Sequence, residues 1–145
     1  MTIAQTTTPT LRIPAVNRPI AIIGSVAVAV AVNLVVWLLG KAAGGSFEVV
    51  KNGATTQVGV GTVISSSAVP LLVGLTLAAL ISYRWAGVLR VAQIVGGVLA
   101  VATIGLTVSA DFDTTTTVAL SVMHLVLAPV LVIGLEAMRR GLSGD

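Results

Sequence analysis

Cysteine is absent from the sequence, and charged and aromatic residues are scarce. Without cysteine the chain can form neither disulfides nor thiolate metal sites, and thiol redox chemistry is excluded. Charged residues make up 9% of the chain, whereas soluble domains carry about 25%. A water-soluble fold could not cover its surface with so few charges, because hydrophobic residues make up 56% of the sequence. We therefore expect the apolar surface to face lipid.

Other partners are also disfavoured by what the chain lacks. The net charge is +3, but the basic residues flank apolar runs instead of forming one stripe, so we expect no nucleic-acid partner. A single histidine without cysteine supplies too few ligands for a metal site. We therefore expect neither a metal nor another cofactor, and the lipid bilayer is the one partner that composition predicts.

Four apolar stretches rich in valine, leucine, isoleucine and alanine lie between the charged residues. A helix needs about 20 such residues to cross about 30 Å of hydrocarbon. A lone strand could not satisfy its backbone in lipid, whereas a helix can. The sequence thus predicts an all-α membrane protein in which residues 19–138 form a single four-helix transmembrane bundle. We expect its spans at about 20–40, 67–83, 88–110 and 116–137.

The arginines give the orientation of this bundle. In a four-span topology they all fall on one side of the membrane, whereas Lys41 and Lys51 fall on the other: Arg12, Arg18, Arg84, Arg90, Arg139 and Arg140. The positive-inside rule assigns the arginine side to the cytoplasm. We expect a multi-pass protein of the plasma (inner) membrane, with cytoplasmic tails at 1–18 and 139–145. Cleavage of the first span as a signal peptide is the alternative, and the arginine pattern disfavours it.

The outer loop at 41–64 contains a hairpin signal. Asn52 and Gly53 form a strong two-residue turn, with strand-like residues on each side, so a short extracytoplasmic β-hairpin is expected between helices 1 and 2. The hairpin is either a plain connector or a partner-binding or lid element. The serines at 65–67 are expected to cap the second span. The few aromatic residues fall at span ends, as in interfacial belts: Trp37, Phe47, Tyr83, Trp85 and Phe112.

Small residues recur at four-residue spacing in three of the spans: Ala27 and Ala31, Gly74 and Ala78, and Ala92, Gly96 and Ala100. Such rows let helix backbones approach closely. They serve either packing inside one bundle or an interface with a membrane-protein partner or a second copy of the chain.

Polar residues inside spans are the candidates for function, because burying them in lipid is costly. His124 lies near the middle of the fourth span, and Thr117, Ser121 and His124 fall on one helical face. Asn33 lies at a similar depth in the first span. Asn33 and His124 either join the helices by pairing with each other, or form a proton or ligand site.

Two acidic residues, Asp111 and Asp113, lie at the outer mouth just before the fourth span. Either they favour the positive N-terminal dipole of that helix, with Asp113 or Thr114 as its cap, or they form a vestibule that attracts cations. At the inner end Glu136 is expected to pair with Arg139 and Arg140, which follow it at helical spacing.

No catalytic constellation is present in the sequence, and we expect no catalytic residues and no enzymatic activity. The preferred interpretation is a structural or interaction protein, either a scaffold or a partner subunit. The alternative is a small transporter or proton-coupled carrier that uses the polar residues within the bundle.

Three segments carry a family resemblance: the first span with Asn33, the Tyr83–Gly87 connection and the Phe112–Pro129 segment. In these the chain resembles an uncharacterised family of four-span membrane proteins of actinobacteria, a domain of unknown function. That family implies the four-span fold but no activity. The long first outer loop and short second loop also look like the claudin and tetraspan layout, by analogy of topology only.

Overall fold

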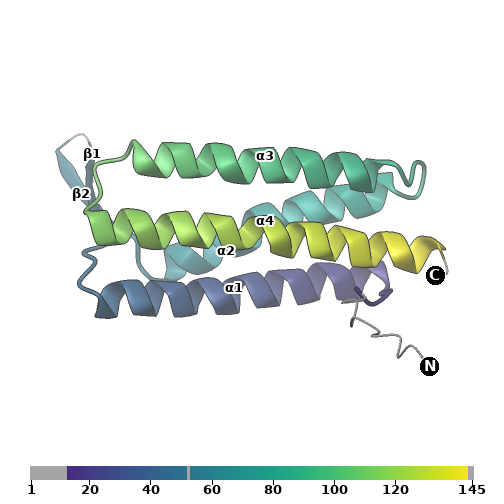
Figure 1. The fold of residues 1–145 in the computed structure, drawn as a ribbon, viewed down its shortest axis with the longest axis horizontal. Helices are drawn as coiled ribbons and strands as arrows, with labels where there is room; N and C mark the ends of the chain where they lie inside the picture. Colours follow the sequence, from purple (N-terminus) through teal and green to yellow (C-terminus); the bar gives the residue numbers. More distant parts are fainter. Residues whose placement is uncertain (1–12, 52, 144–145) are drawn as a thin grey trace, which may run out of the picture.

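The computed structural model describes residues 13–51 and 53–143, and within them it has four long helices and one hairpin (Figure 1). Residues 1–12 of the predicted N-terminal tail lie outside the described part. The elements in chain order are α1 (Arg18–Ala42), β1 (Glu48–Lys51), β2 (Ala54–Gln57), α2 (Val60–Ile81), α3 (Val88–Val108) and α4 (Thr114–Ser143). The prediction of a four-helix bundle with a hairpin between helices 1 and 2 is confirmed.

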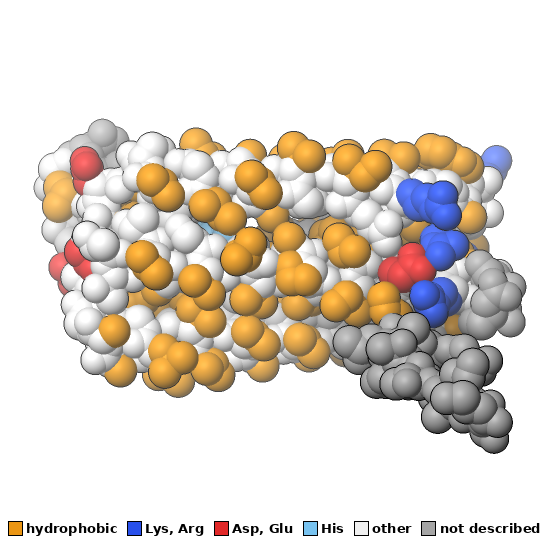
Figure 2. All heavy atoms as spheres, viewed as in Figure 1, with side chains coloured by type: hydrophobic (Ala, Val, Ile, Leu, Met, Phe, Trp, Pro, Cys, Tyr) orange, Lys and Arg blue, Asp and Glu red, His pale blue; other side chains and the backbone are white. Residues whose placement is uncertain are grey.

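All four helices are long and apolar enough to cross a membrane. Hydrophobic side chains cover the length of the bundle in Figure 2, and many are widely exposed, such as Ile23 at 68% and Leu106 at 71%. Such exposure would be unfavourable in water, where each buried square ångström of apolar surface is worth about 25 cal/mol. The chain is therefore a multi-pass membrane protein.

The charges gather at the two ends of the bundle. Figure 2 shows Lys and Arg side chains at the end near both termini, and acidic side chains mostly at the opposite end. α1 begins and α4 ends at the basic end, and the connection from α2 to α3 turns there too. The described arginines thus share one end, as the sequence predicts.

The helices do not pack equally against one another. α1 packs along α2 and α4, and α3 packs along α4, whereas α2 has much less contact with α3 and α4. Figure 1 shows the reason, because α2 runs obliquely behind α4 while α3 stays nearly parallel to it. The bundle is consequently loose between α2 and α3.

The second helix begins earlier than the sequence suggested. α2 starts at Val60 instead of near residue 67, so the serines at 65–67 lie inside the helix and do not cap it. The hydroxyls of Ser65 and Ser66 donate to the carbonyls of Thr62 and Val63 on their own helix. These bonds satisfy polar groups that would otherwise face lipid, which allows the serines to lie within the helix.

The fourth helix also extends beyond its predicted span. α4 continues to Ser143, so residues 139–143, predicted as a tail, prolong the helix. Glu136 accepts hydrogen bonds from Arg139 at 2.7 Å and from Arg140 at 3.2 Å. The predicted pairing is confirmed, and it supports the last turns of the helix.

The hairpin closes the outer end of the bundle through Phe47. β1 and β2 pair antiparallel, with Glu48 opposite Gln57, and Phe47 precedes them with a φ of 55°. Its ring is fully buried against Trp37, whose indole N–H donates to the Val58 carbonyl at 3.0 Å. The expectation that Phe47 lies in the interfacial belt is therefore wrong. It packs instead in a buried outer cluster.

Candidate functional site

Asp113 organises the junction between α4 and the outer loop. Its carboxylate accepts from the backbone N–H of Thr116 at 2.9 Å and from the Ser46 hydroxyl at 2.6 Å. The Thr116 hydroxyl also donates to it, at 2.5 Å, and accepts from the Phe47 N–H at 2.9 Å. The hydrogen bonds from Ser46 and then Thr116 hold the pKa of Asp113 well below its usual range. The predicted capping by Asp113 is confirmed.

Asp111 takes no part in this network. Its side chain is exposed and makes no hydrogen bond or ion pair with any described residue. The Asp113 carboxylate accepts hydrogen bonds from Ser46 and Thr116. The two acids therefore do not present their oxygens together to a cation. In residues 13–51 and 53–143, no three His, Asp or Glu side chains are grouped so that they could hold a metal ion.

Asn33 is paired with α2 and not with His124. Its amide donates to the Ser67 hydroxyl at 2.8 Å, and both side chains are almost fully buried, with exposures of 1% and 2%. The amide oxygen of Asn33 is buried without a partner in the described part of the chain. The suggested pairing of Asn33 with His124 is replaced by this contact. Sequence reasoning missed Ser67 because it placed residues 65–67 before the helix.

His124 hydrogen-bonds to its own helix. Its Nδ1 lies 2.8 Å from the carbonyl oxygen of Leu120. A carbonyl only accepts, so Nδ1 must carry the hydrogen, and in the neutral ring Nε2 is left as an acceptor. Nε2 has no hydrogen-bond partner among the described residues. The imidazole therefore keeps an unused lone pair near the middle of α4.

A cavity of about 630 Å³ lies beside this ring, between α2, α3 and α4. Its wall is built mainly of leucine, valine, alanine and glycine side chains. The polar side chains that reach it are His124, Ser66 on α2 and Thr103 on α3. Binding sites for small molecules typically have about 300–1,000 Å³ and mostly apolar walls with few polar groups. This cavity has the size and lining of such a site.

Only part of the predicted polar face reaches this cavity. Thr117 and Ser121 are partly buried on α4, and neither lines it. The Ser121 hydroxyl oxygen is buried without a hydrogen-bond partner in the described residues. Ser66 and Thr103 were missed because isolated hydroxyls in apolar helices are common. The signal that could have found Ser66 is its position one turn before Pro70, in register with Gly74 and Ala78.

The small residues of α2 and α3 line the cavity. These are Gly74, Ala78, Ala92, Gly96 and Ala100. Gly96 also allows close packing on α4, because a Cβ there would lie 2.6 Å from the Leu131 side chain. At Gly74 a Cβ would meet no atom within 4 Å. Gly96 therefore serves packing inside the bundle, whereas Gly74 leaves space open.

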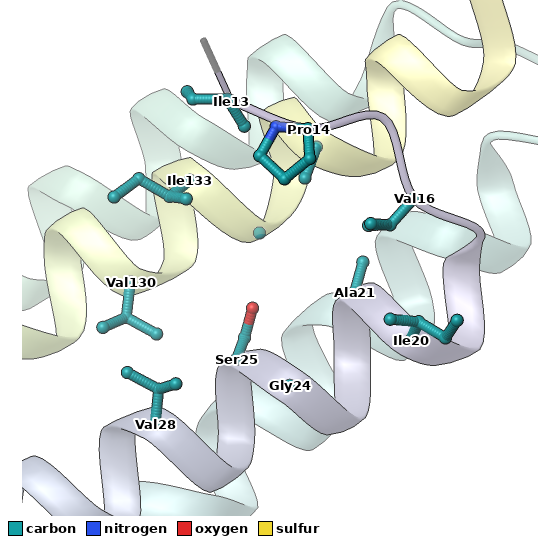
Figure 3. Close-up of a pocket in the computed structure, with 12 residues that line it drawn as sticks. Ile13, Pro14, Val16, Ile20, Ala21, Gly24, Ser25, Val28, Val130 and Ile133 are labelled. Atoms are coloured by element: carbon teal, nitrogen blue, oxygen red, sulfur yellow. The ribbon is translucent and has the colours of Figure 1, made fainter. Parts of the chain in front are cut away.

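A second, smaller pocket of about 250 Å³ lies at the basic end between α1 and α4. Figure 3 shows Ile13 and Pro14 over it, with the Ser25 hydroxyl pointing toward it from α1. Close contact between α1 and α4 forms its floor, since a Cβ on Gly134 would collide with the Ser25 hydroxyl. Its wall is almost wholly apolar and offers no chemistry beyond packing.

Comparison with protein families matches residues 14–141 to DUF6069, a family of unknown function. The chain belongs to this family. The match covers α1 to α3, the hairpin, α4 as far as residue 141 and every residue of the cavity. No curated protein matches the chain. No solved structure matches it either. The function of this DUF6069 member must therefore be argued from the site itself.

Proposed function

We propose that this DUF6069 protein is a non-enzymatic protein of the plasma membrane that binds a small lipophilic molecule between α2, α3 and α4. The observation that supports this most is the 630 Å³ cavity with His124 in its wall. Binding of this kind is the step that a small carrier needs, and it requires no catalytic group. His124 contacts a backbone carbonyl, and no hydroxyl or carboxylate of the described residues hydrogen-bonds to it.

The orientation follows from charge. With the described arginines at the end that carries both termini, the positive-inside rule favours cytoplasmic termini and an outward hairpin. The looser side of the bundle, between α2 and α3, would then face the hydrocarbon. A lipophilic molecule could enter from the bilayer without crossing water.

The test of this proposal is a cavity-filling variant. Gly74→Leu places a side chain in open space inside the cavity, whereas Gly105→Leu adds the same side chain at an exposed position of α3 outside it. Purified protein in nanodiscs is titrated with a panel of environment-sensitive lipophilic dyes. We expect saturable binding that Gly74→Leu abolishes and Gly105→Leu preserves. Binding that is equal in both variants, or no greater than in empty nanodiscs, would refute the proposal.

The second candidate is the scaffold or partner subunit that the sequence favours. All residues of β2 are exposed, and on α1 Ala27 and Ala31 are exposed on the outside of the bundle. These surfaces suit a partner at the outer face or a second copy in the membrane. Replacing Ala54–Gln57 tests for a partner at the outer face, because the replacement spares the buried Phe47 on which the fold depends. Co-purification that survives this replacement and Ala27→Leu would argue against a partner at either surface.

A further inference from the structure

The cavity presents hydrogen-bond acceptors and no free donor. Thr103 donates its hydroxyl hydrogen to the Leu99 carbonyl at 2.7 Å, and Ser66 donates to the Val63 carbonyl at 3.3 Å. His124 donates its Nδ1 hydrogen to the Leu120 carbonyl at 2.8 Å. Each polar side chain of the lining thus gives its only hydrogen to its own helix, and what it offers the cavity is a lone pair.

The lining also carries no charge. Among the residues that the structure describes, no Asp, Glu, Lys or Arg lines the cavity. A bound ammonium ion would have no carboxylate to balance it in a medium where isolated charges are costly. A bound carboxylate would meet neither a cation nor a free N–H. Charged ligands are therefore disfavoured in both signs.

We propose that the ligand is a neutral lipophilic alcohol or phenol whose hydroxyl donates to Nε2 of His124. This inference rests on the proposed binding function and specifies its chemistry. A ketone, quinone or ether brings only acceptors, so it would leave its own oxygen and Nε2 unsatisfied within the cavity. An unsubstituted acyl chain would fill the volume but leave Nε2 unpaired. The hydroxyl donor is thus what distinguishes the ligand from the surrounding lipid.

The ring of His124 is well placed to accept a hydrogen bond from such a hydroxyl. The bond from Nδ1 to Leu120 fixes the tautomer, so Nε2 is kept as the acceptor without reorganisation on binding. The cavity wall beside it is aliphatic, which excludes water that would compete for the lone pair. The hydroxyl oxygens of Ser66 and Thr103 add acceptors on the facing helices for a second hydroxyl, as in a quinol.

The test uses a matched pair of compounds, para-octylphenol and its methyl ether para-octylanisole. They share the octylphenyl body, and the ether replaces the donor hydrogen of the phenol with a methyl group, whose added apolar area would by itself favour the ether. Full-length protein in nanodiscs is titrated with each by calorimetry. We expect the phenol to bind roughly tenfold tighter, which corresponds to about one net hydrogen bond of 1.4 kcal/mol. His124→Phe should reduce the phenol to the affinity of the ether, while Leu125→Phe, on the exposed side of α4, should leave the difference intact.

A spectroscopic readout reports the contact directly. The chain has one histidine, so protein labelled with ¹⁵N-histidine gives the ring signals of His124 alone. The signal of the unprotonated Nε2 should shift when the phenol is added and stay in place with the ether. If both compounds bind equally, or if the phenol saturates the protein without shifting Nε2, the hydroxyl proposal is refuted while the binding function stands. If neither binds to wild-type protein, both proposals fail.

Discussion

The side-chain amide of Asn33 donates a hydrogen bond of 2.8 Å to the hydroxyl of Ser67 and so joins α1 to α2 inside the bundle. His124, at a comparable position along α4, bonds only to the carbonyl of its own helix. Asn33 and His124 therefore differ in what they contact. Asn33 holds helices together, whereas His124 faces a cavity that it does not close.

The Asn33–Ser67 contact should contribute measurably to stability. Ser67→Ala removes the acceptor and leaves the buried amide of Asn33 unsatisfied at both ends, which should cost about 1–3 kcal/mol. Adding Asn33→Leu should restore part of this loss, because removing both partners is less costly than removing one. Reversible unfolding in mixed micelles measures both effects. Ser65→Ala, whose exposed hydroxyl bonds within its own turn, is the control, and the contact is unimportant if Ser67→Ala behaves like it.

Replacement of His124 should change ligand binding but have little effect on stability. Because its hydrogen bond to Leu120 lies within one helix, His124→Leu should change the free energy of unfolding by less than about 1 kcal/mol. The roughly tenfold preference for a hydroxyl compound over its methyl ether should nevertheless be lost. The same unfolding assay and the calorimetric titration give the two quantities on one preparation. A large loss of stability would show that His124 is a packing residue.

Gly40 and Gly105 should respond to alanine in opposite ways. A Cβ on Gly40 would lie 2.7 Å from the Phe47 ring and 2.9 Å from the Ala119 side chain, both buried. Overpacking of this kind costs about 1–3 kcal/mol. At Gly105 a Cβ meets nothing, so alanine should be neutral or stabilise α3 by up to about 1 kcal/mol. Thermal unfolding of the two variants compares them. Equal unfolding midpoints for the two variants would mean that Phe47 does not pack against Gly40.

Stability should depend on pH through Asp113. Its folded-state pKa lies below the ordinary value of 3.8, because the Ser46 and Thr116 hydroxyls and the Thr116 N–H donate to the carboxylate. A lowered pKa stabilises the fold above the unfolded-state pKa, and this contribution is lost as pH falls below about 4. Asp113→Asn should flatten the acid limb of a plot of unfolding midpoint against pH. Asp111→Asn, which removes an exposed acid, should retain that limb, and identical curves for the two variants would contradict the assignment.

The sequence predicts the architecture of this protein more clearly than it predicts the cavity. Charge placement and apolar length predict four helices, and the Asn52-Gly53 turn predicts the hairpin, because these signals are local. The start of α2 could not be read locally, since Ser67 is accommodated by a hydrogen bond from Asn33 on another helix, while Ser65 and Ser66 bond within α2. The cavity was equally invisible, because its lining comes from three helices and depends on how loosely α2 packs against α3 and α4.

The burial of Phe47 illustrates the same limit. A lone aromatic residue after a glycine-rich stretch resembles an interfacial anchor in sequence. Its burial depends on contacts with Gly40, Trp37 and Thr116, which come from α1 and α4. Thr116 lies 69 residues from Phe47 in the chain, so no local pattern reports the contact between them.

Both proposals depend on four membrane crossings with the arginine end inside the cell, and cysteine labelling tests this most directly. The chain has no cysteine, so a single Ala54→Cys in β2 or Ala86→Cys in the α2–α3 connection reports one position without background. Both positions are exposed. An impermeant maleimide applied to intact cells should label Ala54→Cys at once and Ala86→Cys only after permeabilisation. Labelling of both positions from the same side would contradict the four-span topology and the cavity's placement within the bilayer.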